Sequence, residues 1–415
     1  MKHFLSFFLL CVLASCYTHN AHGQTRAYIA NGNSGNSGTV SVINTKTNTI
    51  ISTIAVGRAP VGVSVSPDNT KVYVANAFSN NVSVIATSSN TVIATILVGQ
   101  DPKGLSISPN GTKVYVANQT GATVSVINTN TNTVDATITI PVGGAPTGIS
   151  VTPDGTKVYV ANQIGATVSV INTNTNTVDA TINVGNFPTG VSVSPDGTRV
   201  YVTNQGGTVS VISTLTNTVV ATIITGTSPV GVSMSPDGTK LYVTNSGSSK
   251  TVSVINTNTN TISATITISA NYADGCSISP DGTKVYVANS ASNSVSVIDT
   301  NTNTVSTTIA VGNGPSCFGN IFAVFPDDPA TATDNSLSTQ VKVAPNPSLG
   351  VFSVDFGGIN VSKSLVRVYN AQGTSVHTRK ADNNMSISLE NMPAGIYFLE
   401  VSTEKGTILK KLIKE

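Results

Sequence analysis

The chain has 415 residues, no Trp, only 10% charged residues and a net charge of +2. Between Thr25 and Phe325 it holds 11 Lys and Arg against 10 Asp, with neither His nor Glu. This near-neutral balance gives no reason to expect nucleic acid or an anionic membrane as a partner. The abundance of Asn, Thr, Ser, Gly and Val favours strands and turns over helices.

Residues 1–23 predict a signal for export. Lys2 and His3 precede a 12-residue apolar run that ends at Ser15, too short to span a bilayer as a mature helix. Two processing sites are open. The sequence AHG before Gln24 fits an ordinary signal-peptidase cut, whereas LASC resembles a lipoprotein box that would lipidate Cys16. We favour the cut after Gly23, and we expect no stable membrane span.

A repeated stretch organises the next 300 or so residues. SPDGTKVYVAN, at Ser279–Asn289, has close copies along the chain, and seven copies of its YxxN element follow one another at intervals of 41 to 45 residues. Their tyrosines are Tyr28, Tyr73, Tyr115, Tyr159, Tyr201, Tyr242 and Tyr286. Such a period indicates an array of one supersecondary unit.

Each unit contains four short runs with strand character, such as GVSVSP, RVYVTN, TVSVIST and TVVATI between Gly190 and Ile223. The PDG between the first two runs predicts a tight hairpin. Four antiparallel strands in about 42 residues is the period of a β-propeller blade. A parallel β-helix is the competing architecture, but its coil is shorter and would not need the hairpin. We therefore predict an all-β, seven-bladed propeller over residues 24–326.

The two ends of the array predict how the ring closes. The first unit starts at its second strand, at Ala27, and the last strand-like run, FGNIFAVFP, starts at Phe318. If these two runs pair, one blade is assembled from both ends of the array and no sheet edge is left open there.

The YVTN and YVAN elements with SPDGTKVYV resemble the YVTN family of β-propeller repeats from Thr25 to about Pro326. The resemblance implies a seven-bladed propeller of a bacterial or archaeal surface or periplasmic protein, and no shared chemistry. Some related seven-bladed folds are lactonases or cofactor-dependent dehydrogenases, so the fold leaves the function open.

Residues 327–340 predict a polar linker, and residues 341–415 a small β-sandwich of six or seven strands. The runs APNPSLGVF, VYNAQG and PAGIYFLEV and a lysine-rich end resemble the C-terminal sorting domain of type IX secretion in Bacteroidota. This resemblance implies the type IX machinery as a partner and export to the cell surface or medium, with the domain removed or attached to surface lipid. An adhesive domain that stays on the protein is the alternative. The motif residues are Pro345, Asn346, Pro347, Gly350, Gly373, Pro393, Gly395 and Tyr397.

Residues that break the repeat are the candidates for a site. The aspartates of the PDG turns and the YxxN tyrosines recur in nearly every unit, which suits structure better than a unique site. Five others lie in loops that enter first strands, and we predict that they bind a ligand at the rim: Arg58, Asp101, Lys103, Tyr272 and Asp274. No calcium loop is present, and we expect neither a metal nor a cofactor.

Cys276 and Cys317 lie near the starts of first strands in neighbouring blades. A disulfide between them would fasten the closing blade, since exported proteins allow disulfides. Two buried free thiols are the alternative.

Without His or Glu, the propeller offers little for acid–base chemistry or for binding a metal. We therefore expect a secreted or surface-bound, monomeric propeller that is not an enzyme and that binds a surface protein or polysaccharide. A lactonase-like hydrolase and a structural surface-coat component are the alternatives.

Overall fold

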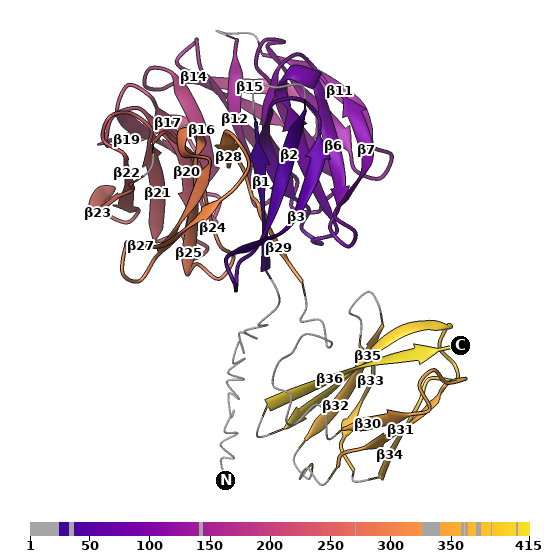
Figure 1. Ribbon diagram of the computed structural model, residues 1–415. Coiled ribbons are helices and arrows are strands. Elements are labelled where there is room, and N and C mark those ends of the chain that lie inside the picture. Colours follow the sequence, from indigo (N-terminus) through magenta and orange to yellow (C-terminus); the bar gives the residue numbers. More distant parts are fainter. Residues whose placement is uncertain are drawn as a thin grey trace, which may run out of the picture. The chain divides into compact units, whose positions relative to one another are not determined.

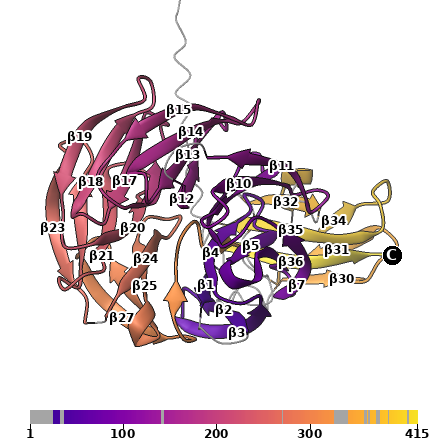
Figure 2. The same cartoon turned by 90° about the horizontal axis from the view of Figure 1, so that it is seen from above.

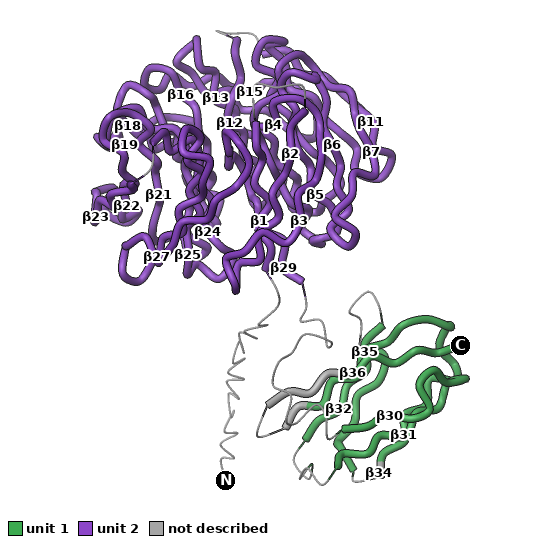
Figure 3. Tube along the Cα trace, in the orientation of Figure 1, with its two compact units in different colours: residues 1–23, 326–415 green, residues 24–325 purple. Residues whose placement is uncertain are grey.

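The computed structural model describes residues 25–32, 37–140, 144–269, 271–325, 341–357, 361, 364–370, 375–382, 384–403 and 406–415. The predicted export signal, the linker 327–340 and Gly373 lie outside these ranges. The chain divides into two compact units, one of which is Gln24–Phe325, while the C-terminal strands belong to the other (Figure 3). Over the described ranges, no helix is both long and apolar enough to cross a membrane.

The larger unit is the predicted seven-bladed propeller (Figures 1 and 2). Its sheets form seven antiparallel blades around an axis, with inner strands toward the centre and outer strands at the circumference. The inner strands of six blades are β4 (Pro60–Val65), β8 (Pro102–Ile107), β12 (Pro146–Val151), β16 (Pro188–Val193), β20 (Pro229–Met234) and β24 (Ala273–Ile278).

The second strands carry the YxxN elements: β1 (Thr25–Asn31), β5 (Lys71–Asn76), β9 (Lys113–Asn118), β13 (Lys157–Asn162), β17 (Arg199–Asn204), β21 (Lys240–Asn245) and β25 (Lys284–Asn289). The third strands are β2 (Gly38–Asn44), β6 (Asn81–Ala86), β10 (Thr123–Asn128), β14 (Thr167–Asn172), β18 (Thr208–Ser213), β22 (Thr251–Asn256) and β26 (Ser294–Asp299). The outer strands are β3 (Thr49–Val56), β7 (Thr91–Leu97), β11 (Thr133–Thr139), β15 (Thr177–Asn183), β19 (Thr218–Ile224), β23 (Thr261–Thr267) and β27 (Thr304–Ala310). Two single-turn 3₁₀ helices, η1 (Ala77–Ser79) and η2 (Ser290–Ser292), follow β5 and β25.

The repeated hairpin between inner and second strands is held by its own side chains. In one copy the Ser194 hydroxyl donates to Asp196 Oδ1 over 2.5 Å, and the same oxygen accepts the Thr198 N–H over 3.0 Å. Gly197 follows with φ +71°, a conformation that glycine adopts without strain. The turn aspartates are therefore structural, as the sequence predicts.

Neighbouring blades are joined by buried tyrosines and by a recurring cation. All seven YxxN tyrosines are buried, and the Tyr28 hydroxyl donates to Asn90 Oδ1 of the next blade over 3.1 Å. Lys71 Nζ reaches the Thr129 carbonyl of the next blade over 2.9 Å. The same contact recurs round the ring, and Lys284 makes it to Thr45 over 3.1 Å, which joins the last full blade to β1–β3.

The ring closes as predicted, but its closing strand is broken. β1 pairs with two short pieces, β28 (Pro315–Ser316) and β29 (Phe322–Val324), so both ends of the array share one blade. The strand therefore begins at Pro315, and not at Phe318 as we expected from the sequence. The other inner strands also begin two residues before the glycine of their alternating run, as β4 begins at Pro60 before Gly62, because backbone pairing extends beyond that run. The closing strand in addition has extra residues between β28 and β29 that interrupt it.

The C-terminal domain contains two sheets, as expected for a β-sandwich. One has the order β30 (Lys342–Ala344), β31 (Val351–Asp355) and β34 (Asn384–Ser388). The other has the order β33 (Ser375–Lys380), β32 (Leu365–Asn370), β35 (Gly395–Thr403) and β36 (Gly406–Lys414). Side chains that alternate along the strands, among them Phe352, Val366 and Leu399, form its apolar core.

Candidate ligand-binding site at the channel mouth

One mouth of the central channel is lined by the second residue of each inner strand. In six blades this residue is Val61, Lys103, Thr147, Thr189, Val230 or Asp274. Together with Gln119, Gln163 and Gln205, which follow second strands, these side chains line a cavity of about 440 Å³. The mouth is thus polar and mostly uncharged, with one cation and one carboxylate among its lining residues.

Asp101 holds the cation of the mouth in place. Its Oδ1 lies 2.9 Å from Lys103 Nζ, and its Oδ2 accepts the Thr120 hydroxyl over 3.2 Å. Asp101 also has a left-handed backbone, with φ +56°, and its N–H donates to Asn80 Oδ1. These contacts fix the loop, so the direction of Lys103 is built into the structure rather than left to solvent.

Asp274 is a recessed carboxyl group in the same cavity. Burial raises its pKa, and the Ser316 hydroxyl and the Lys103 ammonium offset that effect only in part. Lys103 and Asp274 are far apart in the sequence, and the ring brings their charges to the same mouth. A carboxyl group held this way favours a ligand that donates hydrogen bonds or carries an amine, because such a partner stabilises the ionised form.

The five predicted rim residues therefore divide into two groups. Lys103 and Asp274 line the mouth, and Asp101 positions Lys103. Arg58 and Tyr272 are exposed on entry loops, and neither lines that cavity. Tyr272 has φ +55° at the position equivalent to Asp101, so its loop keeps the same backbone while its side chain points to solvent.

The two cysteines are free and buried, so the structure has the thiol alternative and not the disulfide. Cys276 Sγ donates to the Tyr242 carbonyl over 3.6 Å, and Cys317 Sγ lies 4.0 Å from the Tyr286 carbonyl. Burial raises the pKa of Cys276 to about 12 and raises that of Cys317 strongly. Both thiols are thereby kept from forming the reactive thiolate at neutral pH.

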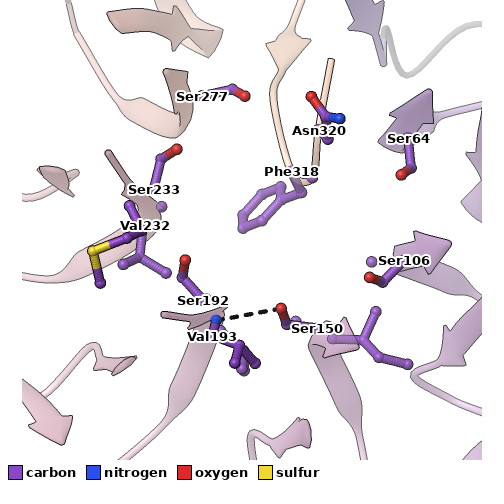
Figure 4. Close-up of a pocket in the computed structure, with 18 of the residues that line it drawn as sticks. Ser64, Ser106, Ser150, Ser192, Val193, Val232, Ser233, Ser277, Phe318 and Asn320 are labelled. Atoms are coloured by element: carbon purple, nitrogen blue, oxygen red, sulfur yellow. Dashed lines mark hydrogen bonds between the residues drawn. The ribbon is translucent and has the colours of Figure 1, made fainter. Parts of the chain in front are cut away.

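A second set of channel residues was missed at the sequence level. Below the mouth, Phe318 lies at the axis and six serines surround it (Figure 4): Ser64, Ser106, Ser150, Ser192, Ser233 and Ser277. The sequence did contain a signal for these residues, since the GVSVSP run alternates small polar and apolar residues.

In the described part of the chain, no three His, Cys, Asp or Glu residues gather closely enough to hold a metal ion.

The motif residues of the C-terminal domain join its two ends. Asn346 donates from Nδ2 to the Lys411 carbonyl over 2.7 Å and accepts the Ile413 N–H over 2.8 Å. Pro345 and Pro347 flank it, each after a cis peptide bond. The Tyr397 hydroxyl donates to the Pro393 carbonyl over 2.7 Å, while Gly350 and Gly395 have positive φ. The APNPS opening is thereby fastened to the lysine-rich final strand.

Comparison with known families agrees with this division of the chain. Residues 342–415 match the family described as secretion system C-terminal sorting domain. Residues 30–140 match the family described as lactonase, 7-bladed beta-propeller. A search of the curated proteins found no match.

Solved structures resemble the propeller as a fold. The Kuenenia stuttgartiensis hydrazine synthase is 22% identical, covers 70% of this chain and 99% of its own, and has a TM-score of 0.58. A functionally unknown protein from Desulfotomaculum acetoxidans is 19% identical, covers 73% and 100%, and has a TM-score of 0.62. A Bacteroides fragilis protein provisionally assigned as a 6-phosphogluconolactonase is 20% identical, covers 72% and 98%, and has a TM-score of 0.61.

Fold and comparisons together define an exported seven-bladed β-propeller protein. Residues 342–415 match the C-terminal sorting domains of a secretion system, and the propeller is lactonase-like in fold. The resemblance found in the sequence is thus confirmed.

Proposed function

We propose that the propeller is a non-enzymatic binding module, carried out of the cell by type IX secretion, which holds a surface protein or polysaccharide at the Lys103–Asp274 mouth. The observation that carries this proposal is the recessed carboxyl of Asp274, which lines the same, otherwise uncharged cavity as the Lys103 cation. The ligand group that fits Asp274 best is an amine or a cluster of hydroxyl donors.

The composition and the burial of the propeller's other titratable groups support binding over catalysis. The propeller contains neither His nor Glu, and burial raises the pKa of Tyr73, Tyr159 and Tyr242 to about 12, so these hydroxyls do not exchange protons near neutral pH. The turn aspartates are occupied in their hairpins. Asp274 is the titratable group of the mouth with a raised pKa, and it lies where a ligand can reach it.

The test is binding of the purified full-length protein to a panel of bacterial and host surface polysaccharides and proteins. We expect one member to bind saturably, and Asp274→Asn and Lys103→Gln each to weaken that binding at least tenfold. Asp135→Asn, a change on an outer strand, is the matched control and should have no effect. Binding that none of the mouth variants weakens would place the ligand elsewhere and sink the proposal.

A lactonase-like hydrolase is the second candidate, because residues 30–140 match the lactonase propeller family. Lactone hydrolysis by the wild type that Asp274→Asn abolishes would replace the binding proposal with this one. Ordered self-association of the purified protein, with no ligand found, would favour a structural coat instead.

A further inference from the structure

The closing strand contains two residues that the ring does not need. In a regular blade the inner strand advances five residues, from Pro60 to Val65, while its partner strand runs from Asn76 to Val72. In the closing blade the equivalent stretch of the partner strand runs from Asn31 to Ala27. Opposite that stretch, the closing strand advances seven residues, from Pro315 to Phe322. Because of these two additional residues, Phe318, Gly319 and Asn320 form a bulge toward the axis (Figure 4).

This bulge is fixed to the neighbouring blade. The Val63 N–H donates to the Phe318 carbonyl over 2.9 Å, and the Val65 N–H donates to the Asn320 carbonyl over 2.9 Å. Between them Gly319 has φ +110°, and a Cβ there would lie 2.3 Å from the Val63 carbonyl oxygen. Only glycine fits this position, so the chain presents Phe318 at one defined place.

Phe318 lines both cavities of the channel. It lines the charged mouth described above, and it also lines a lower chamber of about 470 Å³. The serine ring belongs to the lower chamber, together with aliphatic side chains such as Ile107, Val193 and Met234. The described residues that line the lower chamber include no charged side chain, in contrast to the mouth.

The serines keep hydrogen-bonding capacity for a ligand. Ser106, Ser150 and Ser233 each accept a backbone N–H from the next blade, those of Val151, Val193 and Ile278, over 3.1 to 3.4 Å. That contact uses a lone pair and leaves the hydroxyl hydrogen to donate elsewhere. A ring of hydroxyls that both donate and accept thus surrounds the chamber.

We propose that the lower chamber binds a neutral sugar residue, such as the end of a glycan chain, which packs on Phe318 and bonds to the serine ring. A sugar has hydroxyls round its circumference and C–H groups on its faces, so it matches a ring of hydroxyls around an aromatic side chain. A charged ligand would lose its hydration without a counter-charge. An apolar ligand would leave the hydroxyls unpaired, and a planar base presents its polar groups along its edges in fewer directions. The chamber volume falls in the ~300–1,000 Å³ range of small-molecule sites.

The experiment is titration calorimetry of the purified full-length protein with glucose, galactose, mannose, N-acetylglucosamine and glucuronic acid, and with disaccharides of the neutral four. We expect at least one neutral sugar to bind saturably and glucuronic acid not to bind. Phe318→Leu keeps an apolar side chain at the axis but removes the ring, and it should weaken binding at least tenfold. Ser192→Ala removes one hydroxyl and should weaken binding several-fold, which provides a second measurement if Phe318→Leu fails to fold.

Two control variants separate this site from its surroundings. Phe187→Leu changes an exposed aromatic residue outside the channel, and Lys103→Gln changes the mouth; neither should alter sugar affinity. No saturable binding of any neutral sugar would overturn the inference, as would binding unaffected by both Phe318→Leu and Ser192→Ala. Binding that Lys103→Gln abolishes would place the sugar at the mouth and overturn it too, while supporting the proposed function.

Discussion

Asp196 and its equivalents accept the hydrogen bonds that stabilise the hairpin turns. A hydrogen bond from the Ser194 hydroxyl, followed by one from the Thr198 N–H, holds the pKa of Asp196 below its usual value. Asp154 and Asp237 have lowered pKa values for the same reasons. One copy of the turn has Asn110 instead, whose Oδ1 accepts from Ser108 over 2.8 Å and from the Thr112 N–H over 3.1 Å. The geometry therefore needs an acceptor oxygen, and the charge adds a pH dependence.

The sign of that dependence follows from the lowered pKa. A carboxyl with a depressed folded-state pKa contributes stability above its unfolded pKa of about 3.9, and this contribution is lost as pH falls through the folded pKa. We expect Asp196→Asn to flatten the loss of thermal stability below about pH 4 and Asn110→Asp to steepen it. Each change should be worth less than about 1 kcal/mol, because the turns are exposed and screened. Thermal denaturation from pH 2 to 7 checks both, and identical pH profiles for the three proteins would contradict the explanation.

Asp274 should behave in the opposite way, because burial raises its pKa. Ionisation of Asp274 lowers the free energy of unfolding. This cost begins as pH rises above the pKa of the unfolded state, and it is complete at every pH above the raised pKa of the folded state. We expect Asp274→Asn to raise the midpoint of thermal unfolding at pH 7, with the gain vanishing as pH falls below about 3.9. Asp101→Asn, which breaks a 2.9 Å ion pair with Lys103, should bring no such gain. A lower midpoint for Asp274→Asn at pH 7 would show that the carboxylate is structural rather than held for a ligand.

The closing strand shows which elements could be predicted from the sequence and which could not. Six inner strands, the six hairpins that follow them and all seven second strands follow from a pattern that is repeated, so each copy supports the others. The closing strand occurs once, and its two extra residues have no second copy to align with. The sequence therefore predicted that this strand pairs with β1, but not that a bulge interrupts it.

The candidate site, too, could be predicted from the sequence only in part. The sequence indicated Lys103, Asp101 and Asp274 because they depart from the repeat in loops that enter inner strands. It could not show that Lys103 and Asp274 share a cavity while Arg58 does not, since that depends on the directions of side chains around the ring. The serine ring was overlooked for the reverse reason: it repeats in nearly every blade, and repetition had been interpreted as structural.

Ring closure should depend on β29 more than on the residue that follows it. Phe322 is buried and its ring meets Tyr286 edge-on, 5.2 Å between centroids. We expect Phe322→Ala to cost about 3–5 kcal/mol of unfolding free energy, as for a large core side chain. Phe325→Ala loses a half-buried ring that packs 4.2 Å from the Arg26 guanidinium, and should cost about 1 kcal/mol. Urea denaturation gives both values, and hydrogen exchange should quicken in β1 for Phe322→Ala alone. Equal costs would mean that β29 does not hold the ring closed.

Across the whole propeller, stability comes from contacts that are repeated rather than from one centre. Separate apolar clusters lie between successive blades, and each blade also sends a Lys or Arg to a carbonyl of the next. The chain ends close this series through β1, β28 and β29. The few charges outside the repeat are thus available for binding, and Lys103, whose ion pair with Asp101 lies within one blade, can be changed without removing one of these repeated contacts.

The sorting domain should act on where the protein goes and leave the propeller intact. It is a separate compact unit with its own core, so removal of residues 341–415 should leave the thermal unfolding of the propeller unchanged. In a bacterium with type IX secretion, we expect that deletion to move the protein from the surface or medium to the periplasm. Asn346→Ala breaks the two bonds that fasten the APNPS opening to β36, and should reduce export in part. Cell fractionation with a propeller-directed antibody measures this, with Asp135→Asn as a neutral control. Surface levels that survive the deletion would mean that the domain serves adhesion instead of sorting.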